Sequence, residues 1–88
     1  MTDRLVRSPK VLWRRTLRGV VLRPVGRDTV MLDGSGWLVW EALASPATVE
    51  ELSEQLAART GDEQKVIAAD VQPVLDELAR LGAVVPAS

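Results

Sequence analysis

The side chains that most often carry out chemistry are missing from this chain. It contains no His, Cys or Tyr, so it lacks the imidazole and thiolate groups that serve as common general bases, nucleophiles and metal ligands. Carboxylates, lysines and hydroxyls are the reactive groups that remain. We therefore predict a protein that is not an enzyme and that uses no metal or cofactor.

Two short motifs resemble ligand sites only in part. The segment Asp33-Gly34-Ser35-Gly36 precedes a predicted helix, as a phosphate loop does, but it lacks the third glycine of a dinucleotide site and the Lys-Ser/Thr pair of a phosphate loop. We interpret it as a turn that caps the helix. A second group of carboxylates does not have the spacing of a calcium loop and is interpreted as solvated: Glu50, Glu51, Glu54, Asp62 and Glu63.

Length and composition predict one small domain. Eighty-eight residues are just enough for a single core, and without Cys no disulfide can support it. No apolar run approaches the length of a membrane span or of a signal peptide, so we expect a soluble, cytoplasmic protein. Residues 1–10 lack periodicity, and we predict a mobile basic arm there, followed by a folded domain over residues 11–85.

The charge is unevenly distributed along the chain. Residues 1–40 carry eight basic and three acidic groups, which makes them +5, whereas residues 41–88 carry three basic and nine acidic groups, which makes them −6. Such a dipolar chain can contact a charged partner at either end, although solvated faces explain the pattern more simply.

Three short strands are predicted in the first half of the domain. The runs over residues 11–17, 19–23 and 29–32 are rich in β-formers, and the segments between them contain turn residues. Pro24 cannot donate to a ladder and belongs at a strand end or a turn. We therefore expect a three-stranded antiparallel meander.

Three helices are predicted to follow. Asp33 or Ser35 can cap the first, which carries Trp37 and Trp40 on one side, more typical of core packing than of base stacking, and stops before Pro46. The second opens with a capping box between Thr48 and Glu51 and ends at Gly61.

The third helix is interrupted by a proline in its sequence. Apolar residues recur at helical spacing from Ile67 to Leu81, and Gly82 ends the pattern before a short apolar tail. Pro73 inside a continuous helix would remove one hydrogen bond, whereas with Asp70 as a cap it would fall in a first turn. We expect either a kink near residues 69–73 or two abutting segments.

This element order predicts an α+β fold of the winged helix-turn-helix type, in which nucleic-acid binding is one candidate function. A recognition helix should present basic or amide side chains to bases and phosphates. The third predicted helix instead offers Asp70, Gln72, Asp76, Glu77 and a single Arg80. Its acidic character disfavours docking on phosphates, although the basic first half leaves this class as an alternative.

The third strand is the edge of the predicted meander, and it contains no Pro or Lys to protect that edge. An extended peptide could therefore add as a strand beside residues 28–32. Alternation predicts that Val30 and Leu32 point toward the helices, and Thr29 and Met31 away from them. We predict that the peptide lies between this strand and the last helix, in a groove lined by Asp28, Thr29, Val30, Met31, Leu32, Val66, Ala69, Asp70, Pro73 and Glu77.

The chain resembles the precursor-peptide recognition elements of the PqqD-like family, which are related to the pyrroloquinoline quinone biosynthesis D protein. The resemblance spans roughly residues 11–85 and depends on an ordered combination of segments: Val30-Met31-Leu32-Asp33, a helix with Trp37 and Trp40, Thr48-Val49-Glu50-Glu51-Leu52, and Asp70-Val71 followed by Leu75, Leu78 and Leu81-Gly82-Ala83-Val84-Val85. Pro73 and the basic arm depart from the family pattern.

The resemblance implies a protein that binds the leader segment of a ribosomally synthesised precursor peptide and delivers it to modifying enzymes. Stand-alone members of this size are most similar to the leader-binding protein of lasso-peptide clusters. The partners implied there are the precursor leader peptide, a transglutaminase-like leader peptidase and an asparagine-synthetase-like cyclase. The alternative within the family is a peptide chaperone for a radical enzyme in pyrroloquinoline quinone-type modification.

Overall fold

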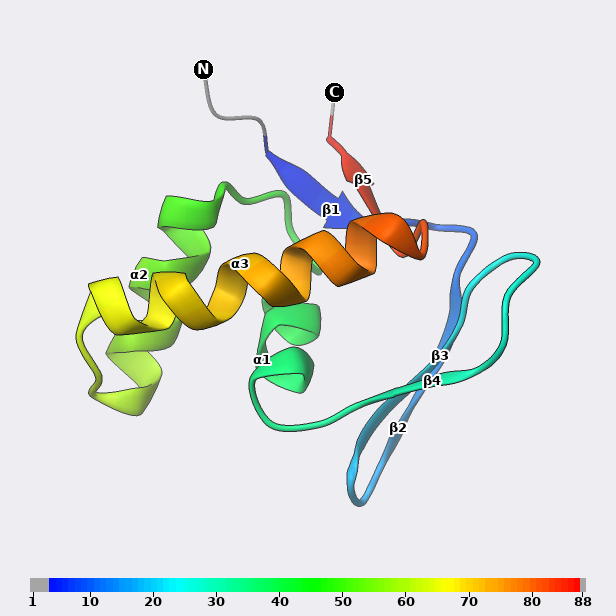
Figure 1. Ribbon diagram of the computed structural model, residues 1–88, viewed down its shortest axis with the longest axis horizontal. Helices are drawn as coiled ribbons and strands as arrows, with labels where there is room; N and C mark the ends of the chain where they lie inside the picture. The colour runs from blue at the N-terminus through cyan, green and yellow to red at the C-terminus, as the bar shows by residue number, and fades with distance from the viewer. Residues whose placement is uncertain (1–3, 88) are drawn as a thin grey trace.

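The computed structural model describes residues 4–87, which form two small antiparallel sheets and three helices (Figure 1). The α+β fold class is confirmed. In chain order the elements are β1 (Leu5–Arg7), β2 (Leu12–Thr16), β3 (Gly19–Arg23), β4 (Val30–Leu32), α1 (Ser35–Ala42), α2 (Val49–Thr60), α3 (Gln64–Arg80) and β5 (Val84–Pro86). Across the described residues, no helix is long and apolar enough to span a bilayer.

The predicted meander is present as the sheet β2-β3-β4. Its register pairs Trp13 with Leu22 and Leu22 with Val30, so these three side chains share the face that meets the helices. Leu22 is fully buried there. The tight packing of β3 against β4 is possible because Gly19, at φ +149°, has no Cβ.

The sequence pattern placed Leu5–Arg7 in an arm before the domain, and the structure differs by making them strand β1. This strand pairs with β5 at the other end of the chain, with Val6 opposite Val85. Leu5 also exchanges two backbone hydrogen bonds with Ala47, at 2.8 and 3.0 Å. A three-residue strand is too short to show periodicity, and its partner lies about eighty residues away in sequence, so local patterns could not reveal it.

The start of α1 also differs from the prediction. Its N-cap is Gly34, and neither Asp33 nor Ser35 caps the helix through its side chain. Gly34 has φ +53°, a backbone conformation that glycine adopts at little cost. The turn therefore depends on the backbone freedom of glycine and not on a side-chain cap.

The capping box of α2 is confirmed. The Thr48 hydroxyl accepts from the Glu51 amide at 3.1 Å, and the Glu51 carboxylate accepts from the Thr48 amide at 2.9 Å. That backbone hydrogen bond is the main reason that the pKa of Glu51 is lowered, with the hydrogen bond from Arg4 contributing next. Gly61 ends the helix in the left-handed conformation, as the pattern predicted.

Helix α3 runs without interruption through Pro73. Its N-cap is Glu63, so the prediction that Asp70 caps a separate second segment is wrong. Four residues of its inner face are buried: Ile67, Val71, Leu75 and Leu78. This burial on both sides of Pro73 offsets the missing backbone hydrogen bond and keeps one helix in place of two.

Replacing Pro73 by Ala should stabilise the protein. Pro73 is exposed, so the change removes little packing, and it restores an amide donor inside a 17-residue helix. We expect a gain of about 1–3 kcal/mol in the free energy of unfolding. Urea denaturation followed by circular dichroism measures it, and a lower midpoint than wild type would show that the helix depends on the proline geometry.

Tryptophan and arginine side chains attach the meander to the helices. Trp13 of β2 meets the buried Trp40 of α1 edge to face, with ring centroids 6.0 Å apart. The Arg7 guanidinium lies 4.7 Å from the Trp13 ring centroid and 5.3 Å from that of Trp40. Burial lowers the pKa of Arg7, an effect that Glu41 opposes.

A second contact joins the same two elements. Arg15 of β2 lies 4.8 Å from the centroid of the Trp37 ring and 3.5 Å from the Glu41 carboxylate, which also accepts from the Trp37 indole at 2.6 Å. The prediction that the two helical tryptophans serve packing is confirmed for Trp40, which is fully buried. These contacts hold the sheet against α1 and thereby position β4 beside α3.

Candidate functional site

A groove lies where the end of β4, the start of α1 and the C-terminal half of α3 meet. Its cavity has a volume of about 340 Å³. Nine residues line it: Met31, Leu32, Asp33, Ser35, Gly36, Pro73, Val74, Glu77 and Leu78. We call this cavity the β4–α3 groove.

The β4–α3 groove combines apolar walls with two carboxylates, one of which is paired with Arg80. Leu78 is buried and Val74 is half-buried, so both present apolar surface to an occupant. The two charged lining residues, Asp33 and Glu77, are both carboxylates. The hydrogen bond from Arg80 is the largest cause of the lowered pKa of Glu77, so this group is ionised at neutral pH.

Strand β4 forms one wall of the groove and is the last strand of its sheet. Within residues 4–87, β3 is the strand that pairs with it, on one side. Val30 and Leu32 pack against the core, whereas the Met31 side chain is 49% exposed. The predicted alternation is therefore confirmed, and the outer edge of β4 presents backbone groups that an added strand can pair with.

The structure brings together four of the ten residues predicted for the peptide site. Met31, Leu32, Pro73 and Glu77 line the β4–α3 groove. Val30 lies against the core, Thr29 is exposed just before β4, and Asp28 lines a separate cavity.

The other three predicted residues lie on α3 but outside the groove lining. Val66, Ala69 and Asp70 are exposed on the helix one to two turns before Pro73, and Val66 is about 10 Å along the helix axis from it. They share a helix face with Pro73 and Glu77. The groove ends before it reaches them because β4, its opposite wall, is only three residues long.

Sequence reasoning missed five groove residues. Val74 and Leu78 belong to the apolar residues that recur at helical spacing from Ile67 to Leu81, a pattern that predicts a place in the core. Asp33, Ser35 and Gly36 were interpreted only as a turn and cap. A signal for Val74 existed, because it directly follows Pro73 and lies one turn before Leu78, at the margin of the apolar stripe. Residues at such a margin belong partly to the core and partly to the surface.

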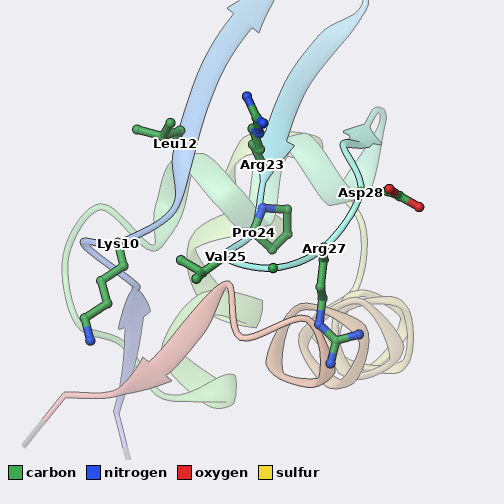
Figure 2. Close-up of a pocket in the computed structure, with 8 residues that line it drawn as sticks. Lys10, Leu12, Arg23, Pro24, Val25, Arg27 and Asp28 are labelled. Atoms are coloured by element: carbon green, nitrogen blue, oxygen red, sulfur yellow. The ribbon is translucent and has the colours of Figure 1, made fainter.

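A second cavity, of about 610 Å³, is lined in part by the loop between β3 and β4 (Figure 2). Its lining combines the loop with residues from β2, β3 and the segment before β2: Lys10, Leu12, Arg23, Pro24, Val25, Gly26, Arg27 and Asp28. Three of these side chains are cationic and one is a carboxylate. We call it the loop cavity.

The two cavities offer binding surface. In the described part of the chain, no cluster of side chains is suited to hold a metal ion. What the site does present is an open strand edge beside an apolar groove, the combination by which sheets pair with extended peptides while pockets select alternate side chains.

Comparison with known proteins gives one family and one similar solved structure. The family model for coenzyme PQQ synthesis protein D (PqqD) matches residues 18–84. The chain also superposes on a solution NMR structure of the PqqD truncation of Methylobacterium extorquens PqqCD, with a TM-score of 0.76 and 23% sequence identity, covering 93% of this chain and 88% of that one.

That PqqD truncation is described as a functional, stand-alone recognition element for ribosomally synthesised and post-translationally modified peptides. At this level of identity the likeness establishes a common fold. No curated protein sequence matches the chain significantly. Because the family model spans most of the sequence and the fold agrees with it, the chain belongs to the PqqD family.

Proposed function

We propose that this protein binds the leader segment of a ribosomally synthesised precursor peptide and presents the peptide to modifying enzymes. The leader pairs with the outer edge of β4, and one of its apolar side chains enters the β4–α3 groove. The observation that carries the proposal is the juxtaposition of an open strand edge with an apolar cavity of about 340 Å³. Membership of the PqqD family supports it.

Two kinds of interaction contribute to recognition of the leader. Backbone hydrogen bonds to β4 contribute affinity for any extended peptide, whereas the groove selects the side chain that fits between Leu32, Val74 and Leu78. Val66, Ala69 and Asp70 extend the same helix face beyond the groove lining, where exposed side chains enclose no anchor and contribute far less to leader affinity. The protein contributes no catalytic group, so its role is delivery and not conversion.

The partner enzymes that we propose are those of a lasso-peptide cluster, namely a transglutaminase-like leader peptidase and an asparagine-synthetase-like cyclase. The resemblance of the chain to the leader-binding proteins of lasso-peptide clusters favours this assignment. The second candidate is a peptide chaperone for a radical enzyme of pyrroloquinoline quinone-type modification, which the PqqD family membership supports equally.

Nucleic-acid binding is a weaker candidate on the observed structure. The exposed face of α3 carries Asp70, Asp76 and Glu77, which repel phosphates. The amide of Gln72 donates to Asp76 at 2.9 Å and is thereby partly engaged. A helix with this surface is poorly suited to the major groove.

The proposal predicts that a short precursor peptide is encoded beside the gene of this protein, and the test uses that peptide. Its leader half and core half are labelled with fluorescein and titrated with the protein, and anisotropy is recorded. We expect saturable binding of the leader half and none of the core half, because the proposal assigns recognition to the leader and modification to the core. Tighter binding to duplex DNA than to the leader at physiological salt would contradict the proposal.

Assays with the enzymes encoded beside the gene of this protein then distinguish the lasso-peptide assignment from the radical-enzyme alternative. Adding this protein should accelerate leader removal by a neighbouring peptidase if the lasso assignment holds, or modification by a neighbouring radical enzyme if the alternative holds. Mass spectrometry of the precursor distinguishes the two products. Equal rates with and without the protein would show that it does not deliver the peptide.

A further inference from the structure

Strand β2 forms a second open edge of the meander sheet. Within residues 4–87, β2 pairs with β3 on one side and with no strand on the other. Its first four residues are exposed, and Figure 1 shows the tip of the β2–β3 hairpin projecting beyond the helices. Alternate residues of such an edge direct both their N–H and their C=O groups away from the sheet, so β2 presents backbone groups for a further strand.

This edge carries exposed apolar side chains. Six large apolar side chains are exposed in the described part of the chain, and three of them lie on β2 or in its hairpin turn: Leu12, Trp13 and Leu17. Leu17 is fully exposed, and Trp13 is 47% exposed although its ring also packs against Trp40. An exposed edge strand with apolar side chains favours pairing with another chain.

The charge of the hairpin is positive. Three of its arginines form no ion pair within residues 4–87: Arg14, Arg18 and Arg23. Arg15 is engaged with Glu41 and lies over Trp37 on the inner face of the sheet. Because strand side chains alternate, Arg14 lies on the outer face, where it is exposed. An acidic side chain beside β2 would therefore meet a cation that is not already paired.

We propose that the β2 edge binds an extended acidic segment of a partner protein, which adds to the sheet as a strand of alternating acidic and apolar residues. Acidic side chains on the outer face pair with Arg14, and apolar side chains on the inner face cover the exposed part of Trp13. The inference goes beyond the proposed function and does not depend on it, because β2 and β4 are opposite edges of one sheet. A leader on β4 and a partner segment on β2 occupy separate sites.

The charges also disfavour a second copy of this chain as the occupant. Two β2 strands paired edge to edge would bring Arg14 and Arg15 close to the same residues of the other copy, and like charges across a strand pair are destabilising. The acidic residues of the second half of this chain lie mainly in α2 and α3, and a helix cannot extend a sheet. An acidic extended segment of another protein supplies both the charge and the conformation that the edge requires.

The test selects binders from an mRNA-displayed library of random linear peptides, using the immobilised full chain with Val74→Trp, which fills the β4–α3 groove. We expect selected peptides to alternate acidic and apolar residues. Adding Arg14→Glu should weaken their binding about threefold to tenfold at low salt, measured by fluorescence anisotropy, because an exposed ion pair becomes a repulsion. A synthetic peptide with lysine in place of its acidic residues should show the opposite preference between the two proteins.

A matched control and a map of the site accompany the affinities. Arg59→Glu changes the net charge equally but lies at the exposed end of α2, so it should leave peptide affinity unchanged. In hydrogen exchange of the complex, the β2 amides that face away from β3 should gain protection, whereas the amides of β4 should not.

Four results would overturn the inference. Selected peptides without an acidic preference, or protection of β4 in place of β2, would show that the β2 edge is not an acidic-segment site. Displacement of the peptide by equimolar duplex DNA would assign the arginines to phosphates. Oligomers of the free protein that Arg14→Glu dissociates, observed by sedimentation velocity, would assign the edge to a second copy. Leader binding at β4 is measured separately with the labelled leader, so failure of either proposal is distinguishable from failure of the other.

Discussion

Val74→Trp should lower the affinity for the precursor leader by about tenfold to a hundredfold. Val74 is half-buried in the wall of a groove of about 340 Å³, and an indole at this position occupies the space that the leader anchor needs. Burying one large apolar side chain contributes about 1.5–3 kcal/mol, and each 1.4 kcal/mol changes affinity about tenfold. Anisotropy titration with the labelled leader measures the loss.

Val66→Trp is the matched control for this variant. Val66 is 53% exposed on the same helix but lies outside the groove lining. The same substitution there should change leader affinity far less, and circular dichroism should show that both variants remain folded. If the Val66 variant lost as much affinity as the Val74 variant, the anchor would bind near the start of α3, and the groove would not be its site.

Gly19→Ala should destabilise the protein by about 2–5 kcal/mol. A Cβ built at this glycine would lie 2.0 Å from the backbone oxygen of Leu32 and 3.2 Å from the Asp33 Cα, so β4 would have to move away from β3. Overpacking of this kind and strained backbone at φ +149° each cost about 1–3 kcal/mol. Urea denaturation gives the change, and the displaced β4 should also bind leader less tightly.

Gly26→Ala separates the steric clash from the backbone effect. Gly26 also has positive φ, at +71°, but no atom lies within 4 Å of the point that an alanine Cβ would occupy there. The alanine should therefore cost only about 1–2 kcal/mol, which is the cost of the left-handed conformation. Equal midpoints for the two variants would show that β3 and β4 tolerate the additional methyl group.

Local chemistry in the sequence was sufficient to predict much of the fold. Thr48 and Glu51 marked the start of α2, Gly61 marked its end, and the alternation in β4 placed Val30 and Leu32 toward the helices. These features depend on hydrogen bonds and periodicities within a few residues, which sequence spacing expresses directly. The absence of His and Cys likewise directed the interpretation toward binding at the outset.

Other features depended on contacts between distant segments. Strand β1 exists through its pairing with β5 and its bonds to Ala47, and α3 continues through Pro73 because its buried face is held on both sides of the proline. Arg7 lies against both Trp13 and Trp40 only because three elements converge there. Contacts between such distant segments leave no local pattern, and helical spacing alone did not decide whether Pro73 interrupts α3.

The groove that we propose as the binding site also combines features of both kinds, some predictable from local sequence and others decided by the tertiary structure. Its general location, between the third strand of the meander and the last helix, followed from the sequence, because an unprotected strand edge next to an amphipathic helix is visible in residue types and spacing. Which residues form it was decided by the tertiary structure. The position of α3 relative to the short β4 selects Pro73, Val74 and Glu77 over Val66 and Ala69, because a cavity is defined by side chains that meet in space and not by their order along the chain.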